Sequence, residues 1–168
     1  MRLTLYTDYA LRVMMFLAVR HASGALSRID EIAQAYGISR SHLTKIVHEL
    51  GQSGMVETLR GRAGGLRLSR PPEAITIGEI VRLAEKDFAV VSCHDPTAGV
   101  PCAIEPACHL RGALARATEA FLRELDRTTL AQSVTTPAAA AVLLGIDAQA
   151  RPVRLPQPTL SRSSRRRP

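Results

Sequence analysis

Residues 38–69, with the sequence ISRSHLTKIVHELGQSGMVETLRGRAGGLRLS, predict one helix followed directly by a β-hairpin. Ser39 is a residue type that favours helix N-termini, because its hydroxyl can accept a hydrogen bond from a free backbone N–H. Residues 55–59 and 66–69 have the character of short strands, and the glycine- and arginine-rich residues 60–65 lie between them. The apolar residues of the helix recur at the spacing of one buried face, namely Leu43, Ile46, Val47 and Leu50.

A second helix is predicted immediately before this stretch. Ser27 and Asp30 form an approximate capping box for residues 28–36, and Gly37 suits the left-handed conformation that commonly ends a helix. Two helices joined by residues 37–39 follow the helix-turn-helix plan, although an ordinary helical hairpin has the same pattern. The β-hairpin that follows has the position of a wing. The sequence therefore predicts a mainly α fold: a winged helix-turn-helix with a small β-hairpin wing.

The helix that begins after Ser39 and the wing carry side chains suited to nucleic acid. Residues 1–70 contain ten basic and five acidic side chains, whereas residues 71–150 contain six basic and ten acidic ones. A basic front half favours contact with a polyanion, and a solvated polar face is the alternative interpretation. Donors and cations can contact the base edges and phosphates of double-stranded DNA. The candidates are Arg40, Ser41, His42, Lys45, Arg60 and Arg62.

The back half combines a cysteine loop with a long helix. Residues 109–132 form the predicted helix, and one of its faces carries an apolar stripe. Because one chain offers little else to cover this stripe, we expect a homodimer paired through the helix, which also suits DNA with two half-sites. The stripe consists of Leu110, Leu114, Ala117, Phe121 and Leu125. The loop, VVSCHDPTAGVPCAIEPACHL at residues 90–110, contains every cysteine of the chain: Cys93, Cys102 and Cys108.

Three clustered thiols indicate metal or redox chemistry rather than structural disulfides. We expect the protein to be cytoplasmic, where thiols stay reduced. Thiolates are the usual ligands of iron–sulfur clusters, and the prolines and the glycine of this loop disfavour regular helix or strand. Two alternatives remain open: zinc with His94 or His109 as a fourth ligand, and a reversible disulfide between Cys93 and Cys102.

Composition divides the chain into three regions. We predict a winged helix-turn-helix domain at residues 1–72, a cluster-binding loop with a dimerisation helix at residues 73–134, and a disordered basic tail at residues 135–168. The first region begins with an amphipathic helix over residues 5–21 rather than a signal peptide. No apolar run is long enough to span a bilayer, so we expect no membrane partner. No phosphate-binding loop, nucleophile elbow or paired-histidine motif indicates an enzyme.

The order of these features resembles the Rrf-two (Rrf2) family of winged-helix transcription regulators. The resemblance covers residues 1–134 and is carried by ISRSHLTKIVHELGQSGMV, by the wing segment GRAGGLRLSRPPEAITIGEIV and by the cysteine loop with its long helix. It implies a homodimeric, iron–sulfur-cluster-dependent repressor that binds operator DNA and releases it when nitric oxide reacts with the cluster. It implies an iron–sulfur cluster held by Cys93, Cys102 and Cys108, for which the four-iron form is favoured over the two-iron form.

The resemblance also implies a fourth ligand from the other protomer. In such regulators an acid near the start of the first helix supplies it, and the matching residue is Asp8. Arg12 lies one turn further on and is placed to orient the carboxylate by a charge-assisted hydrogen bond. Glu85 is a second candidate oxygen donor, and a plain helix N-terminal carboxylate is the alternative role for Asp8. A branch of the family that uses a histidine ligand does not match, because that position is Arg111.

Overall fold

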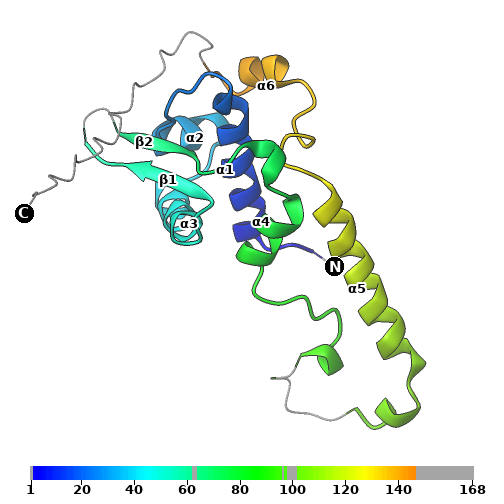
Figure 1. Cartoon of the computed structure of the whole chain (residues 1–168). Helices are drawn as coiled ribbons and strands as arrows, with labels where there is room; N and C mark the ends of the chain where they lie inside the picture. Colours follow the sequence, from blue (N-terminus) through cyan, green and yellow to red (C-terminus); the bar gives the residue numbers. More distant parts are fainter. Residues whose placement is uncertain (1, 62–63, 96, 98–101, 147–168) are drawn as a thin grey trace, which may run out of the picture.

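The computed structural model describes residues 2–61, 64–95, 97 and 102–146. At its centre is helix α1, Leu5–His21, which lies among the other helices of the winged-helix part (Figure 1). The hydroxyl of Thr4 caps this helix by accepting a hydrogen bond from the N–H of Thr7 at 3.3 Å. Burial extends along the whole of α1 because neighbours pack on several of its sides; the buried apolar residues are Ala10, Val13, Met14, Phe16, Leu17 and Val19.

The predicted helix-turn-helix is present. It consists of α2, Ile29–Tyr36, and α3, Arg40–Gln52. Gly37 between them has a φ of 64°, in the left-handed region that favours glycine. Ser39 caps α3 by accepting a hydrogen bond from the N–H of His42 at 3.4 Å. The buried face agrees with the periodicity of the sequence, with Ile32, Leu43, Ile46, Val47 and Leu50 in the core.

The cap predicted for α2 is wrong. Arg28 rather than Ser27 is the N-cap, and its N–H donates to Oε2 of Glu31 at 2.6 Å, so Glu31 rather than Asp30 closes the turn. Ser27 is buried, and its backbone exchanges two hydrogen bonds with Leu66 of the wing. That pairing satisfies the Ser27 backbone through tertiary structure, which a local capping pattern does not reveal.

The wing is an antiparallel hairpin of β1, Val56–Leu59, and β2, Gly65–Leu68, in which Val56 lies opposite Leu68. Both of these residues are buried, so the hairpin is anchored to the core through one face. A Cβ on Gly65 would lie 2.7 Å from the carbonyl oxygen of the buried serine before α2. Glycine is therefore required where the wing passes this segment.

Helix α4, Ile77–Ala84, begins with the predicted capping box. The N–H of Glu79 donates to Oγ1 of Thr76 at 3.1 Å, and the N–H of Thr76 donates to Oε2 of Glu79 at 2.8 Å. Two free N–H groups at the helix start are thereby satisfied reciprocally. Ile80 and Val81 are fully buried, and α4 packs against α1.

Helix α5, His109–Arg127, lies beside α4 and extends past it, away from the wing (Figure 1). A bidentate ion pair joins the two helices, in which Nη2 of Arg82 lies 2.8 Å from Oδ2 of Asp126. Gly78 allows this close approach, because a Cβ there would meet the Asp126 carboxylate. Neither α5 nor any other helix in the described part of the chain is long and apolar enough to cross a membrane.

The helix predicted over residues 109–132 is too long. It ends at Arg127, after which the chain turns back towards the core. The N–H of Leu130 donates to the carbonyl of Ile75 at 2.8 Å, and the Leu130 side chain is fully buried. Burying a leucine stabilises a fold by roughly 1.5–3 kcal/mol, which favours the turn over a helix that continues into solvent.

Part of the segment predicted to be disordered is ordered. Helix α6, Pro137–Leu143, packs against α1, and Ile146 after it is buried. A proline at the first helical turn and a run of alanines favour this short helix. Residues 147–168, where the rest of the predicted tail falls, lie outside the described residues.

One hydrophobic core crosses the boundary predicted at residues 72 and 73. Ile75, Ile80, Leu130 and Val134 from the second region belong to the same cluster as Phe16 and the other apolar side chains of α1. The winged-helix part and the α4 segment are therefore stabilised by the same core. Most of α5 projects from this core (Figure 1).

Candidate nucleic-acid interface and metal centre

The N-terminal end of α3 presents polar side chains to solvent. Arg40, Ser41, His42 and Lys45 are all exposed. Nε of Arg40 lies 3.3 Å from Oδ1 of Asp30, and both side chains are more than 60% exposed, at 70% and 64%. Exposed ion pairs contribute little stability, so Arg40 can exchange this partner for a phosphate. The positive end of the α3 dipole adds to the attraction for a polyanion.

His42 and Lys45 face the start of α1 as well as solvent. They line a groove between α3 and α1 together with Leu5, Tyr9 and Ile46. The rings of Tyr9 and His42 have centroids 6.1 Å apart. His42 is thus partly positioned by α1, which the sequence pattern of α3 did not indicate.

The wing supplies one exposed arginine that the structure describes at its tip. Arg60 follows β1 and is exposed, whereas Arg62 lies outside the described residues. Arg67 on β2 pairs with Glu57 on β1, with Nη2 and Oε2 2.6 Å apart. That pair neutralises the cation of Arg67 and leaves Arg60 as the better candidate for a phosphate contact.

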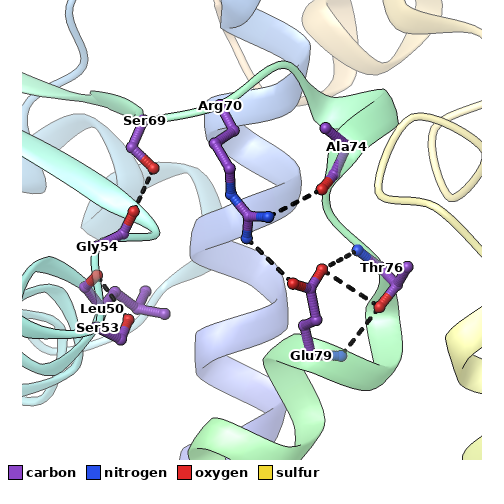
Figure 2. Close-up of polar contacts among 8 residues, drawn as sticks. All are labelled: Leu50, Ser53, Gly54, Ser69, Arg70, Ala74, Thr76 and Glu79. Atoms are coloured by element: carbon purple, nitrogen blue, oxygen red, sulfur yellow. Dashed lines mark hydrogen bonds and ion pairs between the residues drawn. The ribbon is translucent and has the colours of Figure 1, made fainter.

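Arg70 fixes the wing relative to α4, a role that sequence reasoning missed (Figure 2). Its Nη1 donates to the carbonyl of Ala74 at 3.1 Å, and its Nη2 donates to Oε1 of Glu79 at 3.2 Å. The hydroxyl of Ser69, next to Arg70, donates to the carbonyl of Gly54, just after α3. The end of the wing is therefore joined to the end of α3 and to the capping box of α4.

The same contacts change the acidity of Glu79. The N–H of Thr76, followed by the Arg70 guanidinium, holds the pKa of Glu79 below the ordinary glutamate value. Glu79 is consequently ionised at neutral pH while it caps α4. The capping motif of Thr76 and Glu79 is visible in the sequence, but the pairing of Glu79 with Arg70, nine residues earlier, is not.

The three cysteines lie in the segment between α4, Ile77–Ala84, and the start of α5 at His109. All three are free thiols: Cys93 and Cys108 are partly buried, and Cys102 is exposed. Cys93 lies in the short 3-10 helix Ser92–His94, and Cys108 directly precedes α5. Within residues 2–61, 64–95, 97 and 102–146, the structure does not gather three metal-ligating side chains at one point. Binding of a metal itself brings such ligands together, because a metal site is rarely preformed before the metal binds.

The donor set fits an iron–sulfur cluster better than zinc. It offers three unpaired thiols, and thiolates are the usual protein ligands of such clusters. His94, a possible zinc ligand, has its Nε2 3.0 Å from the carbonyl oxygen of Arg111. That contact occupies one ring nitrogen of His94, so zinc ligation through Nε2 would first have to break it.

Asp8 and Arg12 form the predicted ion pair on α1. Nε of Arg12 donates to Oδ2 of Asp8 at 2.9 Å, and the Asp8 side chain is 44% exposed. The Arg12 guanidinium also lies over the Tyr36 ring, 5.5 Å from its centroid. Arg12 therefore connects the Asp8 carboxylate to α2 of the helix-turn-helix, a link that sequence reasoning missed.

Glu85, the second candidate oxygen donor, is engaged within its own chain. Its Oε2 accepts hydrogen bonds from the N–H of Thr4 at 3.0 Å, from the Thr4 hydroxyl at 3.2 Å and from the Thr7 hydroxyl at 2.6 Å. Thr7 is fully buried. These contacts attach the first turn of α1 to the end of α4, and Asp8 has no such set of partners among the described residues.

The apolar stripe of α5 is uncovered in the single chain. No residue of α5, a helix described along its whole length, is buried, and Leu110 is 63% exposed. Leu114, Phe121 and Leu125 are half-buried. An unpartnered stripe of this kind favours association with another apolar surface.

A winged helix-turn-helix with an exposed basic recognition helix defines a DNA-binding transcription regulator. The family described as "Iron-dependent Transcriptional regulator", Rrf2, matches residues 3–136, and the chain belongs to this family. The predicted family and the predicted mainly α winged-helix fold are thereby confirmed.

Named relatives are similar over most of the chain. The chain is 51% identical over 130 residues to the HTH-type transcriptional regulator NsrR of Bacillus subtilis, covering 77% of this chain and 88% of that protein. It is 49% identical over 131 residues to NsrR of Geobacillus kaustophilus, covering 78% and 88%. Among solved structures, CymR, the global cysteine regulator of B. subtilis, is similar with a TM-score of 0.66 and 30% identity, covering 80% of this chain and 97% of CymR.

Proposed function

We propose that this Rrf2-family regulator is a homodimeric repressor that binds operator DNA, carries an iron–sulfur cluster of the four-iron form, and releases the DNA in response to nitric oxide. The observation that carries the proposal is that every thiol of the chain is free and lies between α4 and α5. The description of the family as iron-dependent and the name NsrR of the similar regulators support it.

Cys93, Cys102 and Cys108 would hold the cluster, and Asp8 of a second protomer would complete the donor set. When bound, the cluster supplies iron that is reactive towards nitric oxide, and a carboxylate is a harder and more exchangeable ligand for it than a thiolate. Asp8 is favoured over Glu85, because Glu85 would have to leave Thr4 and Thr7 to bind iron.

The proposed DNA contacts follow from exposure and charge. Arg40, Ser41, His42 and Lys45 would contact the major groove, and Arg60 and Arg62 the phosphates or the minor groove. A two-fold dimer would place two recognition helices at a fixed spacing, which suits two half-sites. The uncovered stripe of α5 supports pairing through that helix.

The cluster is tested by anaerobic purification of the full chain. We expect visible absorption typical of iron–sulfur proteins and about four irons and four sulfides per protomer. Cys93→Ala, Cys102→Ala and Cys108→Ala should each lose this absorption, whereas the neighbouring Ser92→Ala should keep it. Stoichiometric zinc without iron would instead support a zinc-containing regulator of the same fold.

DNA binding is tested with duplexes selected by the purified protein from a random-sequence pool. The cluster-loaded protein should bind the selected duplex, and a nitric oxide donor should release it. Affinity should fall steeply with salt, because cations replace counterions on the phosphates. Binding that is unaffected by loss of iron and by nitric oxide would contradict the proposed sensing function.

A further inference from the structure

The first turn of α1 is joined both to the recognition helix and to the segment that carries the cysteines. The hydroxyl of Tyr6 donates a hydrogen bond to Oε2 of Glu49, in the C-terminal half of α3. On the other side, Glu85 accepts the hydrogen bonds of Thr4 and Thr7. Glu85 ends α4 and begins the connection to the cysteine loop. One helical turn thus touches both functional regions.

Tyr6 and Asp8 lie on opposite sides of this turn. Two residues along an α-helix rotate the side-chain direction by about 200°. Asp8 is therefore open to a second protomer while Tyr6 faces α3. The backbone of the turn is one hydrogen-bonded unit, in which the N–H of Asp8 donates to the carbonyl of Thr4 at 3.1 Å. A displacement of Asp8 is consequently carried to Tyr6.

Two hollows flank the Tyr6 side chain. A groove on one side reaches Lys45 and Ile46, and a cavity on the other side reaches Ala84 and Glu85; Tyr6 lines both. Between these two hollows, the hydrogen bond from Tyr6 to Glu49 joins the first turn of α1 to α3, in addition to the apolar packing of α3 against the core.

We propose that Tyr6 is the positioning residue that couples the state of Asp8 to the recognition helix. The inference rests on the proposed function, since it assumes that Asp8 is held by a second protomer in the DNA-binding state. While Asp8 is held, Tyr6 keeps Glu49 and the end of α3 in place. When Asp8 is free, the turn moves, and α3 loses its fixed position relative to the wing.

The first test needs no cluster. Hydrogen–deuterium exchange is measured on the full cluster-free chain and on Tyr6→Phe. We expect faster exchange in two separate segments of Tyr6→Phe, the first turn of α1 and residues 46–52 of α3. Faster exchange in only one of these segments would show that the hydrogen bond does not connect them and would overturn the inference.

The second test compares DNA affinity with and without the cluster. The ratio of the two affinities measures the coupling, which for linked sites is on the order of 5- to 150-fold. In Tyr6→Phe and in Glu49→Ala the affinity ratio should fall towards one. The double variant should lower the ratio no further, because both substitutions remove the same hydrogen bond. Glu49→Gln keeps an acceptor and should retain most of the ratio.

Tyr9→Phe is the matched control, because it removes a hydroxyl from the same helix three residues on. It should keep the wild-type ratio. If Tyr6 had only a structural role, Tyr6→Phe would lower the DNA affinity by the same factor with and without the cluster, and the ratio would stay unchanged. That result would overturn this inference but not the proposed function. A wild-type ratio of one would overturn the proposed function as well, so the two failures are distinguishable.

Discussion

At the scale of single residues, small polar contacts connect the candidate cluster site to the helix-turn-helix. Asp8 pairs with Arg12, and Arg12 lies over the ring of Tyr36 in α2. Tyr6, two residues before Asp8, donates to Glu49 in α3. Burial, followed by the Glu49 carboxylate, raises the pKa of Tyr6, so its hydroxyl remains a donor. The carboxylate proposed to bind iron is therefore close to links with both helices of the helix-turn-helix.

Asp8→Ala should retain a cluster on three thiolates but with an altered visible spectrum. It should also weaken the effect of nitric oxide on DNA affinity, because the proposed tie between the two protomers is lost. Glu85→Gln, which keeps an acceptor for Thr4 and Thr7, should preserve the wild-type spectrum. The measurement is anaerobic absorption with a gel shift. The reverse pattern, with only Glu85→Gln altered, would assign the ligand to Glu85.

Glu79 should contribute a pH-dependent part of the stability. Its pKa is lower in the folded state than in the unfolded chain, because the Thr76 N–H and Arg70 stabilise the carboxylate. The stabilisation is present above the unfolded pKa and is lost as pH falls through the folded pKa. Its size is about 1 kcal/mol or less, because the side chain is partly exposed.

The measurement for Glu79 is urea unfolding at neutral pH and at about pH 3. Glu79→Gln should lose less free energy of unfolding on acidification than the wild type does. Glu73→Gln, which changes an exposed glutamate of the neighbouring 3-10 helix, should match the wild type. Equal losses for all three proteins would exclude the proposed contribution.

At the scale of elements, the recognition helix and the wing are held by different anchors. Helix α3 is held by its buried apolar face and by Tyr6, and the wing is held by the pairing of its β2 strand with the segment before α2. Arg70 and Ser69 join the two elements at their bases. The exposed cations of α3 and of the wing therefore project from two elements that are joined at their bases.

Lys45→Ala combined with Arg62→Ala should weaken binding to the selected duplex. A lost base contact costs about 1–3 kcal/mol, whereas a lost phosphate contact lowers the salt slope by about one. The measurement is affinity at several salt concentrations. Arg116→Ala with Arg123→Ala, which removes two cations from α5, is the matched control. If the double variant keeps the wild-type affinity and salt slope, Lys45 and Arg62 do not contact DNA as proposed.

At the scale of the whole molecule, one core supports both the DNA-binding part and the base of α5. Ile75, Leu130 and Ile146 join the apolar side chains of α1 in that core. Arg82 and Asp126 hold α5 against α4. Most of α5 extends beyond this joint (Figure 1), and its stripe has no cover in the single chain. The molecule therefore combines a DNA-binding part built on one core with a helical arm whose apolar stripe is the proposed surface for a second copy.

Leu114→Asp combined with Phe121→Asp should convert the proposed dimer to a monomer. Charges without partners are costly to bury, and the loss of two apolar contacts per protomer should raise the dissociation constant by roughly 100-fold or more. Sizing chromatography with light scattering measures this. Because both residues are only half-buried in the protomer, its fold should persist. Ala113→Asp, at an exposed position of α5, is the control. A double variant that remains dimeric would exclude pairing through this stripe.

The sequence by itself determined the elements whose signals are local. The spacing of Leu43, Ile46, Val47 and Leu50, the cap at Ser39 and the box of Thr76 with Glu79 each lie within about one to three helical turns. Such patterns need no knowledge of distant residues, because helix periodicity and capping depend on the neighbouring chain. The exposed cations of α3 and the grouping of all thiols followed in the same way.

Only the tertiary structure decided the features that depend on residues far apart in the chain. Helix α5 ends at Arg127 because Leu130 is buried near Ile75, and the segment before α2 is paired with the wing rather than capping the helix. Tyr6 meets Glu49, and Thr7 meets Glu85, across 43 and 78 residues. These contacts form because α1 packs between α3 and α4, and packing between distant segments leaves no periodic signal in the sequence.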